Sequence, residues 1–235
     1  MNIHSTPFSS DPVPDYFRNV RKEIEPLLPV QIRKVLEIGC GAGGTMAWLR
    51  TIRSIEYAAG VEISPDAAAL ARGAFDEVIT ADITKSAIDF GQAKFDVVLA
   101  LDVLEHLPDP WQVLRFLNGM MEPGGTLIAS IPNVAHYSVA FPLLFKGRWN
   151  YTEDGLLDRT HLRFFTRETV GRMFEETGFS VERIATNTRF PRIFSPLGLT
   201  GRRWTWYSEK LFRTVFGSSH RFFDWQFLVV ARPKT

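Results

Sequence analysis

Short apolar runs with strand character alternate along this chain with segments of helical periodicity, and this alternation is what most constrains the fold. Parallel strands need crossover connections, and the helices that provide them cover both faces of the sheet. The pattern therefore predicts an α/β fold built on a parallel sheet. Seven strands are expected, at Lys34–Ile38, Tyr57–Glu62, Glu77–Thr80, Phe95–Leu101, Thr126–Pro132, Val181–Thr186 and Phe222–Ala231.

Helix signals lie between the expected strands. Ser64 and Asp109 each precede a proline, which places an N-cap before a favourable first helical residue. Thr166 opens a third helix, for which Gly178 provides the C-cap. A fourth helix is expected at the start of the chain, where Phe17, Val20 and Ile24 recur at helical spacing before Pro26 ends it.

Length and charge limit the number of domains and the classes of partner. At about 150 residues per domain, 235 residues predict one domain, here residues 31–235, preceded by a helical lid at residues 1–30. Insertions are expected at residues 133–165 and 188–221, where acceptor pockets are commonly built.

Lys and Arg total 27 against 26 Asp and Glu, a net charge of +1, which gives no electrostatic basis for nucleic-acid binding. A single cysteine and no signal-type start favour the cytoplasm.

A glycine turn follows the first expected strand. Gly39, Gly41, Gly43 and Gly44 lie between that strand and a helix beginning near Thr45. Glycine allows a sharp turn and a close approach of a ligand to the helix N-terminus. The spacing fits both G-x-G-x-G and G-x-G-x-x-G, so the turn is compatible with a nucleoside-binding methyltransferase or with an NAD-dependent oxidoreductase.

Two acids lie beside this turn. Glu62 ends the second strand, where a carboxylate can accept hydrogen bonds from a ribose diol in either class of enzyme. Glu37 precedes Gly39 by two residues, and its charge would repel a pyrophosphate but attract an ammonium or sulfonium group. A cationic nucleoside is therefore favoured, although a buried acid bonded to backbone amides is the alternative for Glu37.

The chain from Lys34 to Pro132 resembles the class I S-adenosylmethionine-dependent methyltransferases through five motifs in order: VLEIGCGAG, GVEIS, ADI, FDVVLALDVLEHLPDP and EPGGTLIASIPN. The resemblance implies a doubly wound, Rossmann-like sheet of seven strands with the last strand antiparallel, and S-adenosylmethionine as cofactor with S-adenosylhomocysteine as product. It also implies cofactor contacts: Glu37, Gly39, Cys40, Gly41 and Gly43 at the methionine moiety and its turn, Glu62 and Ile63 at ribose and adenine, Asp82 and Ile83 at the adenine, and Leu101 and Asp102 beneath the methionine. Tyr16 resembles an aromatic lid over the cofactor, and packing within its helix is the alternative reading.

Histidine is the natural proton acceptor near neutral pH, and two histidines are well placed. His106 follows the fourth strand, and His161 lies in a polar cluster ahead of the Thr166 helix. Each has a structural alternative, His106 as a helix-start residue and His161 as a loop anchor tied to Asp158. The chain has no H-E-x-x-H motif and no cysteine cluster, so no metal centre is expected.

The segment DRTHLRFFT resembles methyltransferases found beside bacterial glycosyltransferases and related to the ubiquinone-pathway O-methyltransferases, in which this region borders the acceptor pocket. The resemblance implies a glycan or a small hydroxylated acceptor near Asp158, Arg159 and Arg163. Asn133 and His136 follow the fifth strand, where they can hydrogen-bond an acceptor or cap a loop.

The second insertion is basic and aromatic. Between residues 189 and 221, seven Lys and Arg residues stand against Glu209 alone, and residues 202–216 have the spacing of a short amphipathic helix. Such a helix can receive an anionic acceptor, contact an acidic membrane surface or close a homodimer. A flap that packs its aromatic side chains on the domain is the alternative.

The preferred interpretation is an enzyme that transfers a methyl group from S-adenosylmethionine to oxygen, or with less support nitrogen, of a small or glycan-type acceptor. Two alternatives stay open from the sequence. One is an NAD-dependent oxidoreductase, and the other is a non-catalytic S-adenosylmethionine-binding interaction protein.

Overall fold

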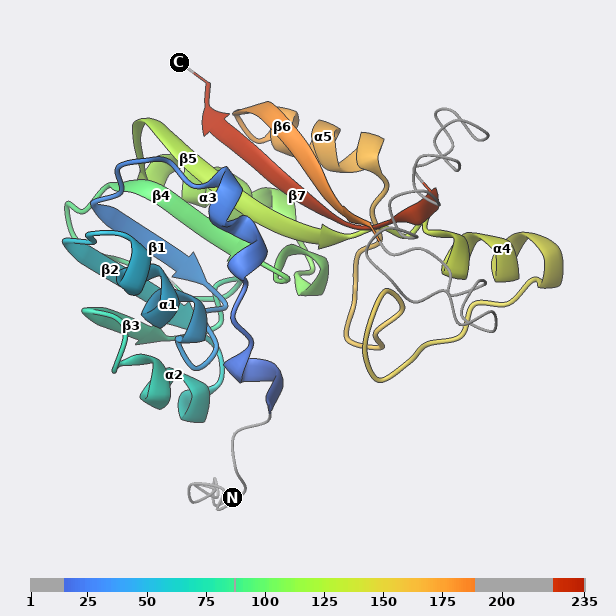
Figure 1. The fold of residues 1–235 in the computed structure, drawn as a ribbon, viewed down its shortest axis with the longest axis horizontal. Coiled ribbons are helices and arrows are strands. Elements are labelled where there is room, and N and C mark those ends of the chain that lie inside the picture. Colours follow the sequence, from blue (N-terminus) through green and yellow to red (C-terminus); the bar gives the residue numbers. More distant parts are fainter. Residues whose placement is uncertain (1–14, 87, 189–221, 235) are drawn as a thin grey trace, which may run out of the picture.

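A computed structural model describes residues 15–86, 88–188 and 222–234 (Figure 1). In these ranges it contains one seven-stranded sheet with the order β3-β2-β1-β4-β5-β7-β6. The strands are β1 (Lys34–Ile38), β2 (Tyr57–Glu62), β3 (Glu77–Thr80), β4 (Phe95–Leu101), β5 (Met121–Pro132), β6 (Phe179–Thr188) and β7 (Asp224–Pro233). The first four have the bounds that the sequence predicts, and the last three begin or end a few residues away.

The strand directions match the expected doubly wound topology. Strands β1 to β5 pair in parallel, and β7 runs antiparallel between β5 and β6. The chain order reverses beside β1, since β2 and β3 lie on one side of it and β4 and β5 on the other. In an open α/β sheet, ligands bind at the carboxyl ends of the strands at this switch point.

Helices connect the strands. The α-helices are α1 (Gly44–Ile52), α2 (Pro65–Ala71), α3 (Pro110–Met120), α4 (Tyr137–Lys146) and α5 (Arg167–Glu176), and short 3-10 helices are η1 (Asp15–Arg18), η2 (Lys22–Leu27) and η3 (Leu104–His106). Ser64, Asp109 and Thr166 accept backbone hydrogen bonds as N-caps, as predicted. Figure 1 shows α4 beyond the end of the sheet, apart from the helices that cover it.

The sheet has an apolar layer on each face. Side chains alternate along β1, so that Val35 packs with Met46 and Leu49 of α1 in one buried cluster. Leu36 belongs to the opposite cluster, which includes Leu114 of α3 and residues of α5. Two covered faces make β1 and β4 almost wholly buried, which is typical of parallel strands.

The predicted continuous helix at the start of the chain is wrong. The structure has two short 3-10 helices there, and Pro26 lies inside the second of them. Residues between them run in other conformations, and Arg21 at the start of η2 uses its backbone N–H to bond the Thr45 hydroxyl at 3.2 Å. A proline has no N–H for an α-helical hydrogen bond, so the weak periodicity here is insufficient for an α-helix.

The structure describes one of the two predicted insertions. Residues 133–165 hold α4 and a long loop that returns to the sheet edge, whereas nearly all of residues 188–221 lie outside the described residues. In the part of the chain that the structure describes, every helix is too short or too polar to cross a membrane. The boundary between a lid at residues 1–30 and the remaining domain stays a prediction, as does the cytoplasmic location.

Candidate active site

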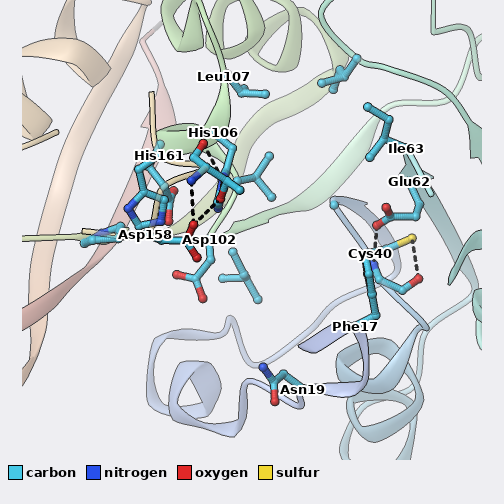
Figure 2. A pocket seen from close by; sticks show the side chains of 18 of the residues that line it. Phe17, Asn19, Cys40, Glu62, Ile63, Asp102, His106, Leu107, Asp158 and His161 are labelled. Atoms are coloured by element: carbon cyan, nitrogen blue, oxygen red, sulfur yellow. Dashed lines mark hydrogen bonds between the residues drawn. The ribbon is translucent and has the colours of Figure 1, made fainter. Parts of the chain in front are cut away.

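A cavity of about 940 Å³ opens at the carboxyl ends of β1, β2 and β4. This volume is near the upper end of the range for ligand sites, about 300–1,000 Å³. Figure 2 shows its two ends: Glu62, Ile63 and Cys40 lie on one side, and His106, His161 and Asp158 on the other. Other predicted residues that line it are Glu37, Gly39, Gly41, Asp82, Ile83, Leu101 and Asp102.

The glycine turn forms the floor of the first end. Gly41 has a φ of +54°, and a Cβ placed there would lie 2.7 Å from the backbone oxygen of Phe17. The amide N–H of Ala42 also donates to that oxygen at 2.8 Å. Only glycine combines this backbone conformation with so close an approach. Gly43, by contrast, faces Ala71 of α2 and is outside the cavity lining, so its place in the structure is at a helix contact.

Glu62 is buried and holds the turn in place. Its carboxylate oxygens accept hydrogen bonds from the backbone N–H of Gly41 at 2.8 Å and of Ser64 at 2.9 Å. A carboxylate has about four lone-pair positions, so each oxygen retains acceptor capacity toward the cavity. The geometry is compatible with the predicted contact to a ribose diol.

Glu37 is the second buried acid at this end, only 3% exposed. Its Oε2 atom has no hydrogen-bond partner in the described chain. Burial, reinforced by the nearby Glu62 carboxylate and partly offset by Arg21, raises the pKa of Glu37 to about 8. A buried acid without a full set of partners disagrees with the structural alternative and marks a place where a cationic ligand would satisfy it.

Beyond Glu62, the wall of the cavity is formed by residues after β2 and β3. Ile63 is exposed to the cavity opening, and Ile83 lines it nearby. Asp82 lines it too, but its carboxylate accepts from Lys85 at 2.8 Å and from the Thr84 hydroxyl at 2.6 Å. These bonds, that of Lys85 foremost, lower the pKa of Asp82 to about 2. Asp82 therefore carries its charge throughout the physiological range.

Asp102 lines the cavity directly after β4, on the same side as His106 and Asp158 (Figure 2). It is the one described non-glycine residue with a positive φ, +56°. Its carboxylate accepts from the Ser130 hydroxyl at 2.9 Å, from the amide of Gln226 and from the guanidinium of Arg21, which forms an ion pair with it. The strained backbone is thus held by strands β5 and β7 and by the N-terminal segment.

The second end is built from η3 and the loop that precedes α5. His106 Nδ1 lies 3.1 Å from the hydroxyl and 3.3 Å from the carbonyl oxygen of Thr160. His161 Nδ1 lies 3.3 Å from the carbonyl oxygen of Leu156. The two imidazole rings meet edge to face with centroids 4.7 Å apart. Burial lowers the pKa of both histidines, so both are neutral near pH 7.

His161 and Asp158 are linked by a backbone hydrogen bond. The Asp158 carboxylate accepts from the N–H and the hydroxyl of Thr160, at 2.7 and 2.6 Å. Asp158 contacts His161 only through its backbone oxygen, which accepts the His161 N–H at 3.0 Å. Its side chain therefore orients Thr160, and through Thr160 the ring of His106.

Glu105 is the main residue at this end that the sequence reasoning missed. It is 1% exposed, lines the cavity, and neither carboxylate oxygen has a hydrogen-bond partner in the described chain. Burial raises its pKa to about 8. Glu105, His106 and His161 each offer a side-chain ligand atom within 4.8 Å of the others. In the sequence, the adjacent Glu105 and His106 were the only signal for this cluster, because His161 comes close to them only in the folded chain.

Four predicted acceptor residues lie outside the cavity lining. The buried Asn133 amide donates to the backbone oxygen of Asp224 at 2.7 Å, and His136 is the N-cap of α4. Arg159 pairs with Glu153 at the surface, and Arg163 donates to the backbone oxygen of Pro108. Their roles toward an acceptor stay predictions. Tyr16 belongs to η1, and its side chain lies outside the described residues.

Both ends of the chain contribute lining residues that no motif identified. Phe17, Asn19 and Arg21 come from the N-terminal segment, and Trp225 and Gln226 from the start of β7. Arg21 connects them, because its guanidinium donates to the Gln226 side-chain oxygen at 2.9 Å. The N-terminal segment thus forms a wall of the cavity.

Comparison with known proteins decides what kind of nucleoside site this is. A family model described as a methyltransferase domain matches residues 14–184, which is more than half of the chain. The chain belongs to the methyltransferase domain family. The matched residues include the glycine turn, both buried acids at the first end and all three clustered residues at the second.

Curated relatives of the methyltransferase point the same way. It is 28% identical over 160 residues to the ubiquinone biosynthesis O-methyltransferase of Chromobacterium violaceum, covering 65% of this chain and 67% of that protein. It is 34% identical over 117 residues to the corresponding protein of Alkalilimnicola ehrlichii, covering 48% of this chain and 47% of that one. The chain thus spans about half to two thirds of the length of these relatives.

Solved structures share the fold. An S-adenosylmethionine-dependent methyltransferase from Mesorhizobium loti has a TM-score of 0.58 at 19% identity, covering 92% of this chain and 99% of that one. Another from Archaeoglobus fulgidus has a TM-score of 0.60 at 22% identity, covering 92% and 96%. The resemblance to class I methyltransferases is confirmed, and so is the Rossmann-like sheet.

S-adenosylmethionine is the cofactor, and the first end of the cavity has the features that it requires. Glu37 presents an unpartnered carboxylate oxygen to a cationic ligand, and Gly41 leaves no Cβ at the turn. A pyrophosphate-containing dinucleotide would place negative charge beside Glu37 and Glu62 instead. Neither the comparisons nor these contacts support the oxidoreductase alternative.

Proposed function

We propose that the methyltransferase methylates a hydroxyl oxygen of a small or glycan-type acceptor, which occupies the second end of the cavity. The observation that carries this proposal is the buried cluster of Glu105, His106 and His161, which lines the same cavity as Glu37 and Glu62. The two sets of residues divide the cavity into a donor end and an acceptor end, and Asp102 lies on the side of His106 and Asp158 (Figure 2).

At the donor end, the chain binds and orients the cofactor. We assign Glu37 to the positively charged methionine moiety, Glu62 to the ribose hydroxyls, and Asp82 with Ile83 and Ile63 to the adenine. Gly39, Gly41, Cys40, Leu101 and Asp102 complete the wall beside the methionine. When bound, S-adenosylmethionine supplies a methyl group activated by its sulfonium and leaves as S-adenosylhomocysteine. Alignment of the acceptor with that methyl group is then the main requirement.

At the acceptor end, both imidazoles have a defined tautomer. A carbonyl oxygen only accepts, so the contact to Leu156 places a hydrogen on Nδ1 of His161. The Thr160 hydroxyl gives its hydrogen to Asp158, so His106 Nδ1 must donate to Thr160. The Nε2 atoms of both rings therefore carry lone pairs. These can accept a hydrogen bond from an acceptor hydroxyl, which supports the predicted catalytic roles of His106 and His161.

The names of the curated relatives support oxygen as the acceptor atom, since they are O-methyltransferases of ubiquinone biosynthesis. The glycan class of acceptor rests on the segment around Asp158 and Arg163 alone. Homodimer formation and membrane contact through residues 202–216 stay predictions, because that segment lies outside the described residues.

The test uses the full-length chain and S-adenosylmethionine labelled in its methyl group. Catechols, simple sugars and amines of similar size are supplied as acceptors, and products are identified by mass spectrometry and NMR. We expect methyl ethers from hydroxylated acceptors. Methylated amines alone would contradict the oxygen assignment. Cofactor binding without transfer to any acceptor would favour the non-catalytic alternative.

A further inference from the structure

The acceptor end holds a buried carboxylate that the fold leaves without a partner. Glu105 is 1% exposed, and neither of its oxygens has a hydrogen bond in the described chain. Each unmet buried polar group of this kind costs about 1–3 kcal/mol, and more when it is charged. Arg163 and Leu162 approach this residue, but they use their N–H groups to bond its backbone oxygen, not its side chain.

Two imidazoles close to this carboxylate are typical ligands of a metal ion. Glu105, His106 and His161 each present one ligand atom within 4.8 Å of the others. Side-chain rotations must shorten these separations to bind one ion, because ligand bonds to Zn²⁺ are about 2.0–2.2 Å long. Two imidazole nitrogens and one carboxylate are the ligand types of the 2-His-1-carboxylate sites, in which further coordination positions stay open.

The hydrogen bonds that hold the two histidine rings have the arrangement found at metal sites. Metal-bound histidines almost always donate their other ring N–H to a carbonyl or a carboxylate, which fixes the tautomer. His161 donates from Nδ1 to the Leu156 carbonyl, and His106 donates to Thr160, whose hydroxyl is held by Asp158. Both rings thus keep Nε2 unprotonated and oriented by the surrounding chain.

We propose that Glu105, His106 and His161 bind a divalent transition-metal cation of the Mn²⁺ or Zn²⁺ class. Imidazole suits Zn²⁺ and the carboxylate suits Mn²⁺, whereas Mg²⁺ prefers an all-oxygen set. The inference departs from the sequence analysis, which expected no metal centre because the chain lacks the known metal motifs. The spacing from residue 106 to residue 161 fits none of the short local patterns used to recognise zinc sites.

The role of this cation rests on the proposed function, because the cation would activate the acceptor hydroxyl for methyl transfer. All three residues line the cavity, so an acceptor hydroxyl oxygen bound in it can coordinate the ion. Coordination lowers the pKa of that hydroxyl, and its proton leaves to solvent water. The imidazoles then act as ligands, and the cation takes over the activation of the hydroxyl from them.

The site is tested without cofactor or acceptor. The full-length chain is treated with a chelator, transferred to metal-free buffer and titrated with Mn²⁺, and bound ion is measured by electron paramagnetic resonance and by calorimetry. We expect one Mn²⁺ per chain, displaced by Zn²⁺ and not by Mg²⁺ at equal concentration. Absence of saturable Mn²⁺ or Zn²⁺ binding would overturn the proposal.

Variants locate the ion. Glu105→Gln and His161→Ala should each lower Mn²⁺ affinity by at least about 100-fold, and Thr160→Val by about tenfold, because outer partners are worth about 10- to 100-fold. Glu153→Gln, an acid in the same cavity, and His136→Asn, a histidine outside the cluster, are matched controls that should bind as the wild type does. Circular dichroism verifies that each variant is folded. Equal binding by wild type and both cluster variants would refute the site.

The outcomes separate this inference from the proposed function. Methyl transfer to hydroxyl groups by a protein that binds no cation would leave the proposed function standing and overturn the metal site. Cation binding at the cluster without methyl transfer to any hydroxylated acceptor would support the site and contradict the proposed function.

Discussion

Replacement of Glu37 by glutamine should uncouple cofactor binding from proton release. In the cofactor-free protein, burial and the neighbouring Glu62 raise the pKa of Glu37 from its usual 4.5 to about 8. Glu37 is therefore protonated near pH 6.5 before the cofactor binds. A positively charged methionine moiety beside it favours the carboxylate, so binding must expel the proton.

The size of the effect follows from the pKa shift. If the bound cofactor returns the pKa of Glu37 to its usual range, binding at about pH 6.5 releases about one proton, and affinity rises about tenfold per pH unit up to about pH 8. The full shift corresponds to about 5 kcal/mol. Glu37→Gln has no proton to release, so its affinity for S-adenosylmethionine should be lower and nearly independent of pH.

Calorimetry in buffers of different ionisation enthalpy measures the released proton directly. The slope of observed enthalpy against buffer enthalpy should give about one proton for the wild type and about zero for Glu37→Gln. Glu25→Gln, a change at an exposed acid, should behave as the wild type does. Equal proton release by wild type and Glu37→Gln, or none by either, would refute this account of Glu37.

The same substitution should change stability in a defined direction. An acid whose pKa is higher in the folded protein than in the unfolded chain weakens the fold as pH rises, here between 4.5 and about 8. Without cofactor at about pH 7, Glu37→Gln should therefore raise the free energy of unfolding, by up to about 3 kcal/mol. Urea unfolding at several pH values measures the difference, which should vanish below about pH 4.5.

Three further substitutions test other parts of the site. Glu62→Ala should weaken S-adenosylmethionine binding by about 1.5–3 kcal/mol, since it removes charge-assisted hydrogen bonds, and an unchanged dissociation constant would exclude Glu62 from the site. Gly41→Ala should lower both cofactor affinity and thermal stability, because its Cβ would lie 2.7 Å from the Phe17 oxygen. Calorimetry and a melting experiment measure the two quantities. Wild-type values of both would show that the backbone at Phe17 moves away without cost. His161→Ala should lower kcat by at least about 100-fold and leave cofactor affinity unchanged; loss of stability without a selective effect on kcat would instead identify a structural residue.

The sequence predicted that the residues at the first end of the cavity lie together, because they follow strands. Their contacts to the cofactor stay predictions. Alternating apolar runs located β1, β2 and β4, and parallel strands bring their carboxyl ends to one edge of the sheet. Glu62 at the end of β2 and the turn at Gly39 therefore had to lie close together. The antiparallel direction of β7 came from the family resemblance. Its position between β5 and β6 is seen only in the structure, because periodicity alone does not specify strand order.

The acceptor end depended on contacts between residues far apart in the chain. Glu105 looks in the sequence like any acid in a short helical turn, and only the fold buries it without a partner beside His161. Arg21 and Gln226 lie near opposite ends of the chain, and their hydrogen bond forms only because β7 inserts beside β5. The predicted N-terminal helix failed for a local reason, since Pro26 and weak periodicity permit only 3-10 turns.

A crystal structure of the full chain with S-adenosylhomocysteine tests the central claim most directly. We expect the ribose hydroxyls within hydrogen-bond distance of Glu62, the amino group beside Glu37, and open space between the sulfur atom and the cluster of His106 and His161. A nucleoside bound elsewhere on the protein, or a bound product whose sulfur points away from that cluster, would contradict the division of the cavity into donor and acceptor ends.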